Sequence, residues 1–400
     1  MDSLQEGFSR HVAWTSDSPL GLVVDYAEGP YIVLRSGQRL IDFISGIAVS
    51  SLGHRHPRVI RAIREQVDRH LHVMVYGEFI QQAQVEYARL LCAQLPEPLQ
   101  AVYFTMTGTE ANEGALKLAK KATGRTKLIA FERSYHGDTH GSLSVTGRSV
   151  YRDPFLPLLP NVEFLPFDDT RALAAIDVST ACVITEPIQG EGGIRVPSAD
   201  WMQALRARCT EVGALLIFDE IQTGFGRTGT LFAFEGFGIV PDILTLAKAM
   251  AGGMPLGGFV ASPKMLEVLR RDPPLSHVTT FGGHAVSCAA ALATLKVLLE
   301  EDLPGQAQRI ETYARERLRH PLIREVRGRG AMLGMVLRNS GTTARVVREC
   351  LGRGLLLGWT LHSDTLVRLA PPLNISSAVL TRSLDILMAV LDDTRVHDES

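Results

Sequence analysis

The sequence is poor in lysine and has no paired cysteines. Seven of the 41 basic residues are lysines, at positions 117, 120, 121, 127, 248, 264 and 296, and the other 34 are arginines. The five cysteines, at positions 92, 182, 209, 288 and 350, are scattered and form no CxxC pair. This spacing argues against a disulfide framework and against a zinc site. Because lysine is scarce, the surroundings of each lysine are informative.

The chain also lacks a long apolar run and an excess of charge of either sign. No stretch approaches the roughly 18 unbroken apolar residues of a membrane-spanning helix. The start, MDSLQEGFSRHVAW, does not have the basic and then apolar order of a secretory signal. A net charge of −2 argues against a broad basic surface for nucleic acid, and 46% hydrophobic residues exclude a disordered chain. We therefore expect a cytoplasmic globular protein with neither membrane nor nucleic-acid partners.

Short apolar runs alternate with helical periodicity along the chain. The runs lie at residues 101–106, 127–131, 181–185, 214–218, 242–247 and 257–262, and helical patterns cover 57–71, 81–95, 110–122, 199–212 and 284–300. Continuous apolar runs between helices are typical of a mostly parallel sheet buried on both faces. The pattern predicts an α/β fold with a large domain at 57–283. A smaller α+β domain would combine the N-terminal segment 1–56 with residues 284–400, including strands at 330–337 and 365–370.

Two polar motifs follow predicted strands of this sheet. In TGTEAN (107–112), Gly108 permits a tight turn, Thr109 suits an N-cap, and the amides of the first helical turn form an anion site. Taken alone, a plain capped helix explains this motif as well. Asp219 ends the run ALLIF at the sheet edge where α/β proteins bind ligands. Because Glu220 comes next, one of the two carboxylates should face the pocket and the other should face away.

Lys248 lies among apolar and small residues in ILTLAKAMAGGMPLG. Desolvation lowers the pKa of an amine, and a neutral amine can form a Schiff base with an aldehyde. The alternative is a lysine that extends its charge out of an apolar segment. A nearby G-x-G-x-x-G pattern at 224–229 is misleading, because residues 230–241 leave no room for the crossover helix of a dinucleotide-binding fold. A single cofactor, pyridoxal phosphate, would account for TGTEAN, Asp219 and Lys248 together. It needs a phosphate-binding site, a carboxylate at its ring nitrogen and a lysine for its aldehyde.

The motifs TGTEANEGALKLA, SYHGD, EPIQGEGG, FDEIQTGFGRTG, LAKAMAGGMPLGG and TTFGGHAVSCAAALATL occur in this order. Together they resemble the class III (subgroup II) aminotransferases of fold type I, such as acetylornithine, ornithine, 4-aminobutyrate and putrescine aminotransferases. The resemblance extends from residue 46 to residue 373. It implies pyridoxal phosphate as cofactor and amino transfer from an ω-amine or amino acid to 2-oxoglutarate. Racemases, aminomutases and lyases that use the same fold and cofactor remain the alternative.

The resemblance also implies a role for each matching residue. Lys248 would bind the cofactor's aldehyde and move the substrate's proton, and Asp219 would pair with the ring nitrogen. The other residues implied to bind the cofactor are Gly108 and Thr109 at the phosphate, Tyr135 and Ile221 on the two ring faces, His136 beside them, and Glu186 and Gln222 near the phenolic oxygen. Thr280 would reach the phosphate of a neighbouring subunit, so we expect a homodimer or a larger homo-oligomer with shared active sites. No metal is expected.

Substrate residues are implied in the same way. Arg368, in RLAPPL, resembles the arginine that binds the substrate's α-carboxylate, and Glu191 resembles the glutamate that pairs with it when the bound amine has no carboxylate there. Many family members continue the SYHG motif with an arginine for a second carboxylate, but this chain has Asp138. Arg148 or a residue of the other subunit could replace that arginine. Some segments are most similar to acetylornithine aminotransferases and others to putrescine aminotransferases, so the amino donor is left open.

Overall fold

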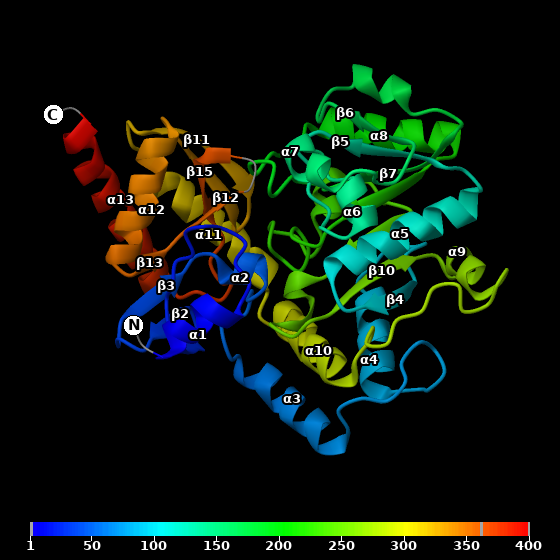
Figure 1. Cartoon of the computed structure of the whole chain (residues 1–400), viewed down its shortest axis with the longest axis horizontal. Helices are drawn as coiled ribbons and strands as arrows, with labels where there is room; N and C mark the ends of the chain where they lie inside the picture. Colours follow the sequence, from blue (N-terminus) through cyan, green and yellow to red (C-terminus); the bar gives the residue numbers. More distant parts are fainter. Residues whose placement is uncertain (1–2, 361–362, 399–400) are drawn as a thin grey trace.

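The computed structural model describes residues 3–360 and 363–398. Within them, a seven-stranded sheet has the order β4-β10-β9-β8-β7-β5-β6 (Figure 1). Its strands are β4 (Ala101–Thr105), β5 (Lys127–Phe131), β6 (Val162–Leu165), β7 (Thr180–Thr185), β8 (Leu215–Asp219), β9 (Ile243–Leu246) and β10 (Gly257–Ala261). Strands β5 to β9 pair in parallel, whereas β10 runs antiparallel to both of its neighbours. The predicted mostly parallel sheet is confirmed, although β6 was not among the predicted strands.

Both faces of this sheet are buried because its strands are apolar at successive positions. On β8, Leu216 and Phe218 pack in the same cluster as Trp201 of α8 (Ala199–Val212). Ile217, which points to the opposite face, packs with Leu116 of α5 (Gly108–Thr123). Alternate side chains of a strand point to opposite faces, so a run without polar residues requires a helical layer on each side.

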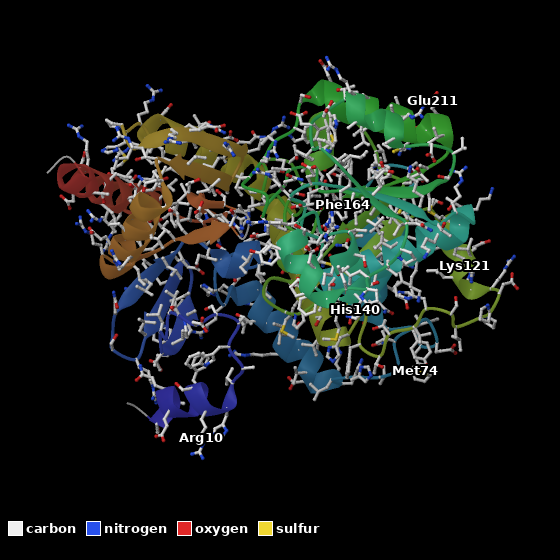
Figure 2. All side chains as sticks on the ribbon, turned by 45° about the horizontal axis from the view of Figure 1, so that its top comes forward. Arg10, Met74, Lys121, His140, Phe164 and Glu211 are labelled. Carbon is white, nitrogen blue, oxygen red and sulfur yellow. The ribbon has the colours of Figure 1, made fainter. Side chains whose placement is uncertain are left out.

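The remaining helices complete the layers. They are α1 (Ser3–His11), α2 (Ser45–Ala48), α3 (Pro57–Arg69), α4 (Gln82–Cys92), α6 (His140–Ser144), α7 (Ser149–Arg152), α9 (Pro263–Leu266), α10 (Ala285–Glu300), α11 (Leu303–Arg317), α12 (Ser340–Gly352) and α13 (Ser377–Asp398). Helix α10 packs against α3 and α4. Figure 2 shows α1, with the labelled Arg10, on the far side of the molecule from Glu211 of α8. No helix in the described part of the chain is long and apolar enough to cross a membrane.

Two smaller sheets join the ends of the chain. In the described residues, β1 (Val24–Glu28), β2 (Tyr31–Leu34) and β3 (Arg39–Asp42) form one sheet with β13 (Leu355–Leu356). The other sheet has the order β11 (Ile323–Arg329), β12 (Met332–Leu337), β15 (Ser363–Leu369) and β14 (Gly358–Thr360). Because β3 pairs in parallel with β13, the N-terminal segment shares a sheet with residues near the C-terminus. Figure 1 shows these parts together, on the left of the view.

The glycine-rich turns at 224–229 connect the large sheet to these smaller ones. The loop between β8 and β9, which the structure describes in full, contains a 3₁₀ turn at Ala233–Phe237 and no crossover helix. A dinucleotide-binding fold would need a helix at this point, so the G-x-G-x-x-G pattern does not mark such a fold. Arg227 in this loop is completely buried and donates hydrogen bonds to the Ala331 carbonyl (3.2 Å), the Pro371 carbonyl (2.6 Å) and Ser51 Oγ (3.0 Å). Burial lowers the pKa of Arg227 to about 10. The guanidinium of Arg227 therefore connects the loop after β8 to three chain segments that flank the smaller sheets.

Candidate functional site

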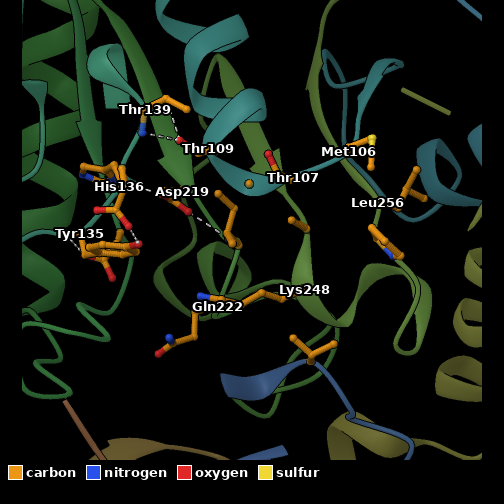
Figure 3. A pocket seen from close by; sticks show the side chains of 18 of the residues that line it. Met106, Thr107, Thr109, Tyr135, His136, Thr139, Asp219, Gln222, Lys248 and Leu256 are labelled. Carbon is orange, nitrogen blue, oxygen red and sulfur yellow. Dashed lines mark hydrogen bonds and ion pairs between the residues drawn. The ribbon is translucent and has the colours of Figure 1, made fainter. Parts of the chain in front are cut away.

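A cavity of about 680 Å³ lies where β8 and β9 end and α5 begins (Figure 3). Ten of the twelve predicted site residues line it: Gly108, Thr109, Tyr135, His136, Glu186, Glu191, Asp219, Ile221, Gln222 and Lys248. Arg368 and Thr280 do not. The volume is in the range of small-molecule sites, and the position at the carboxyl ends of parallel strands is the expected one for an α/β fold.

Asp219 is held by a buried network at the base of this cavity. Its Oδ2 accepts hydrogen bonds from Asn112 Nδ2 (2.8 Å) and is 2.8 Å from His136 Nδ1, and its Oδ1 accepts from the Ile221 amide (3.0 Å). Asn112 Oδ1 in turn accepts from Thr245 Oγ1 at 2.8 Å. These contacts fix the carboxylate, because a buried charge must be paired or hydrogen-bonded to persist. Sequence reasoning missed Asn112 and Thr245, although Asn112 lies inside the TGTEAN motif.

Glu220 faces away from the cavity, as the alternation of side chains predicts. Its carboxylate accepts hydrogen bonds from the Ala233 and Phe234 amides at 2.7 and 2.8 Å and from Thr223 Oγ1 at 2.9 Å. Burial raises the pKa of Glu220 to about 7. Of the two consecutive carboxylates, Asp219 is therefore the one available to a ligand.

Lys248 is the first residue of a short 3₁₀ turn that follows β9. Its backbone has φ of +48°, a conformation that costs a non-glycine residue about 1–3 kcal/mol and is concentrated at functional sites. Burial lowers the pKa of the Lys248 amine, although the carboxylates of Glu191, Asp219 and Glu186 oppose this effect. The amine is therefore closer to its neutral, nucleophilic form than that of an exposed lysine.

The start of α5 differs in one respect from the prediction. The helix begins at Gly108, and its N-cap is Thr107, whose side chain accepts from the Glu110 amide at 3.2 Å. The expectation that Thr109 is the N-cap was wrong, because Thr109 already lies within the helix and its hydroxyl contacts Thr139 Oγ1 (2.7 Å). The first amides of the helix still lack intrahelical acceptors and face the cavity, which suits an anion.

Close packing explains one glycine at this site. A Cβ atom on Gly108 would lie 2.8 Å from Ile221 Cδ1, which is nearer than real Cβ atoms approach a neighbour. Glycine therefore lets the N-terminus of α5 approach Ile221 while both residues line the cavity.

Glu186 connects the loop after β5 with the loop after β7. Its carboxylate accepts from the Tyr135 amide (3.0 Å) and the Gly190 amide (2.8 Å). Burial raises the pKa of Glu186 to about 7. Beside it, Gln222 Oε1 is buried without a hydrogen-bond partner among the described residues, and so is His136 Nε2. Buried polar atoms are normally paired, so such orphans in a cavity wall indicate groups that a ligand would satisfy.

Arg368 and Glu191 form an ion pair at the edge of the cavity. Arg368 lies on β15, and its Nη2 contacts Glu191 Oε1. The side chains of Arg368 and Glu191 are 3% and 9% exposed. Arg368 Nε has no partner within the described residues. The structure therefore brings together two residues that sequence reasoning paired only by resemblance.

Three other residues lie where the sequence left questions. Thr280 is exposed and does not line this chain's own cavity. Asp138 does line it, and its Oδ2 accepts from the Tyr135 hydroxyl at 2.8 Å. Arg148, one suggested substitute for a carboxylate-binding arginine, lies against the Tyr151 ring at 5.5 Å and is not part of the cavity lining. No cluster of three potential metal ligands occurs in residues 3–360 and 363–398.

Comparisons with known proteins agree with this geometry. A family model for class-III aminotransferases matches residues 12–391. The acetylornithine aminotransferase of Methanopyrus kandleri is 43% identical over 389 residues, which cover 96% of this chain and 97% of that protein. The ornithine aminotransferase of Toxoplasma gondii, whose active site is partly occupied by pyridoxal phosphate, superposes with a TM-score of 0.92 at 29% identity, over 99% of this chain and 95% of that chain. An (S)-enantioselective ω-transaminase from Thermomicrobium roseum gives a TM-score of 0.88 at 30% identity, over 97% of each chain.

The chain therefore belongs to the class-III aminotransferase family, which uses pyridoxal phosphate. It is a transaminase. The residues present fit this cofactor on three observations: a helix N-terminus open to a phosphate, the fixed carboxylate of Asp219, and a buried amine on Lys248 with a lowered pKa. The orphaned Gln222 Oε1 and His136 Nε2 add polar atoms that the bound group could contact.

Proposed function

We propose that this transaminase moves an amino group from an ω-amine or amino acid to 2-oxoglutarate. The observation that carries the proposal is the buried pair of Arg368 with Glu191. A guanidinium binds a carboxylate strongly in two parallel hydrogen bonds, so Arg368 can hold an acidic substrate when Glu191 releases it. With Glu191 in place, the same pocket presents no free positive charge at this point and accepts an amine.

We further propose how the cavity residues divide the chemistry. Pyridoxal phosphate, when bound, supplies an aldehyde for amines and a protonated ring that withdraws electrons. Asp219, fixed by Asn112 and His136, would keep the proton on the ring nitrogen. Lys248 Nζ would bind the aldehyde and then carry the proton that leaves the substrate carbon, a task suited to an amine with a lowered pKa. Amides at the start of α5 would hold the phosphate, and Tyr135 and Ile221 would enclose the ring.

The architecture suggests two further proposals. We propose a large cofactor-binding domain at 57–283 and a small domain built from 1–56 with 284–400, since β3 pairs with β13 across the chain. We also propose a homodimer or larger homo-oligomer, in which the exposed Thr280 of one subunit contributes to the phosphate site of the next.

A panel of amino donors tests the proposed reaction. Ornithine, acetylornithine, putrescine, 4-aminobutyrate and lysine would each be mixed with 2-oxoglutarate or with pyruvate, and glutamate or alanine would be measured. We expect glutamate with at least one donor. An amino acid that is inverted or eliminated while no glutamate or alanine forms would contradict the proposal and identify a racemase or lyase on the same fold.

A further inference from the structure

The carboxylates that line the cavity differ in how they are compensated. Glu191 is paired with Arg368, and Asp219 is beside His136. Glu186 is bound by two backbone amides, and burial raises its pKa to about 7, which reduces its charge. The only partner that the described residues give to the Asp138 carboxylate is the neutral hydroxyl of Tyr135.

Tyr135 orients Asp138 without neutralising it. The hydroxyl donates to Oδ2 at 2.8 Å, and burial, with Asp138 itself as a further cause, raises the pKa of Tyr135, so the hydroxyl keeps its proton. A carboxylate offers about four lone-pair positions, so Oδ1 and one side of Oδ2 stay open to another donor. Asp138 is exposed and lines the cavity, which places this open acceptor where a ligand enters.

The cavity is a ligand site on independent grounds. Gln222 Oε1 and His136 Nε2 are buried in its wall without partners in the described residues. The lining contains no arginine among the described residues, and its basic side chains are Lys248 and His136. Apart from the carboxylate that Arg368 is proposed to hold, a substrate carboxylate therefore meets no arginine in the lining, whereas a second ammonium group meets the carboxylate of Asp138.

We propose that Asp138, oriented by Tyr135, binds the distal ammonium group of an aliphatic diamine whose other amine reacts at Lys248. This inference rests on the proposed amino transfer and names its donor class. The distal end of a diamine carries an ammonium group and no carboxylate. The distal end of an N-acylated amino acid carries a neutral amide and a carboxylate, and Asp138 would repel that carboxylate.

The kinetic test compares three donors that each have four carbons: putrescine with a distal ammonium group, butylamine with a distal methyl group, and 4-aminobutyrate with a distal carboxylate. The wild-type holoenzyme should prefer putrescine to butylamine in kcat/KM, and butylamine to 4-aminobutyrate. In Asp138→Asn the amide oxygen can still accept from Tyr135 while the charge is lost. The putrescine-to-butylamine ratio should fall about ten-fold, because the charged hydrogen bond to the distal ammonium group is lost and solvent weakens that bond in the wild type.

Asp200→Asn is the matched control, because Asp200 is an exposed aspartate at the start of α8 and lies outside the cavity lining. Asp200→Asn makes the same change of charge. It should leave the kcat/KM ratios of putrescine to butylamine and of butylamine to 4-aminobutyrate unchanged. Equal losses for putrescine and butylamine in Asp138→Asn, or no preference for putrescine in the wild type, would overturn the inference.

A binding measurement separates this inference from the proposed reaction. Tetramethylated putrescine carries two cations but has no primary amine to transfer, and dimethylated butylamine is its singly charged counterpart. Calorimetry on the holoenzyme should show that tetramethylated putrescine binds more tightly than dimethylated butylamine. In Asp138→Asn the ratio of their dissociation constants should shrink about ten-fold. If that difference is present while no amine yields glutamate or alanine, the amino-transfer proposal fails and Asp138 stands as a diamine receptor. If amines yield glutamate but the difference is absent, the inference about Asp138 fails alone.

Discussion

Asn112 donates a hydrogen bond to Asp219, with 2.8 Å between Nδ2 and Oδ2. Asn112 lies one turn inside α5, and its side chain is completely buried. The helix whose first amides face the cavity thus also positions the carboxylate at the cavity's base. A single helix therefore fixes the proposed phosphate site and the Asp219 carboxylate relative to each other.

Replacing Asn112 with alanine should weaken cofactor binding. The change leaves Asp219 with fewer donors and leaves Thr245 without its acceptor, so we expect a loss of about 1–3 kcal/mol in the free energy of unfolding. Urea denaturation of the apoprotein and titration with pyridoxal phosphate would measure the two effects. Asn339→Ala is the control, because it removes the N-cap of α12 away from the cavity. A similar fall in cofactor affinity in that control would show that lowered stability alone explains the result.

Lys248→Ala should abolish covalent attachment of the cofactor. The wild-type protein should keep a visible absorbance band through gel filtration, and the variant should lose it and form no glutamate. Lys264→Ala, at an exposed position in α9, should keep the band. An unchanged spectrum in Lys248→Ala would contradict the assignment of the lysine and the use of the cofactor at this site.

Arg368→Ala should impair the reaction of 2-oxoglutarate much more than that of putrescine. A charged hydrogen bond contributes about 1.5–3 kcal/mol, which corresponds to a ten- to hundred-fold loss in kcat/KM for the acidic substrate. The variant also removes the guanidinium that pairs with the buried Glu191 carboxylate, so we expect it to unfold about 3–5 kcal/mol more easily. Adding Glu191→Ala should recover part of the stability and none of the 2-oxoglutarate activity. Equal losses for both substrates would contradict an Arg368–Glu191 switch.

Glu186 should make the apoprotein less stable as the pH rises. Burial raises its pKa from 4.5 to about 7, so the folded state holds a proton that the unfolded state releases first. The stabilisation that comes from keeping Glu186 protonated is fully present below pH 4.5 and is lost between pH 4.5 and about 7. Above that pH the free energy of unfolding changes no further, and the total loss is roughly 3 kcal/mol.

Glu186→Gln should remove this loss, so the variant gains stability relative to the wild type across that interval. Urea denaturation at a series of pH values would measure the difference, with the exposed Glu316→Gln in α11 as a control. A constant difference between Glu186→Gln and wild type over the whole series would show that Glu186 ionises normally.

The sequence predicted the residues whose signal is local. Lys248 stood out in an apolar segment and Asp219 at a strand end, and both line the cavity. Residue patterns alone did not predict contacts that depend on the path of the chain. Asn112 reaches Asp219 across 107 positions, a contact that was not predicted. Arg368 reaches Glu191 across 177 positions, a pairing that only the family resemblance implied. The cap of α5 was assigned to Thr109 rather than Thr107 because both suit an N-cap, and backbone dihedrals decide between them.

Other predictions need more than one chain to be tested. Thr280 was expected to act on a neighbouring subunit, and a single subunit shows only that it is exposed and outside its own cavity. Asp138 was recognised as a departure from an expected arginine, but its contact with the Tyr135 hydroxyl depends on the turn between them. Side-chain direction in a turn follows from backbone geometry that the residue types alone do not determine.

Arg227 limits how the two ends of the molecule can move. Its guanidinium is completely buried and bonded to Ser51, Ala331 and Pro371, so a hinge opening at this junction would leave a charge without its acceptors. That penalty disfavours a wide swing of the large sheet away from the smaller ones. Substrate entry should then depend on local movement of residues that line the cavity, among them Val49 and residues 253–256. Turnover in this protein would then be limited by local rearrangement of the cavity lining rather than by opening and closing of whole domains.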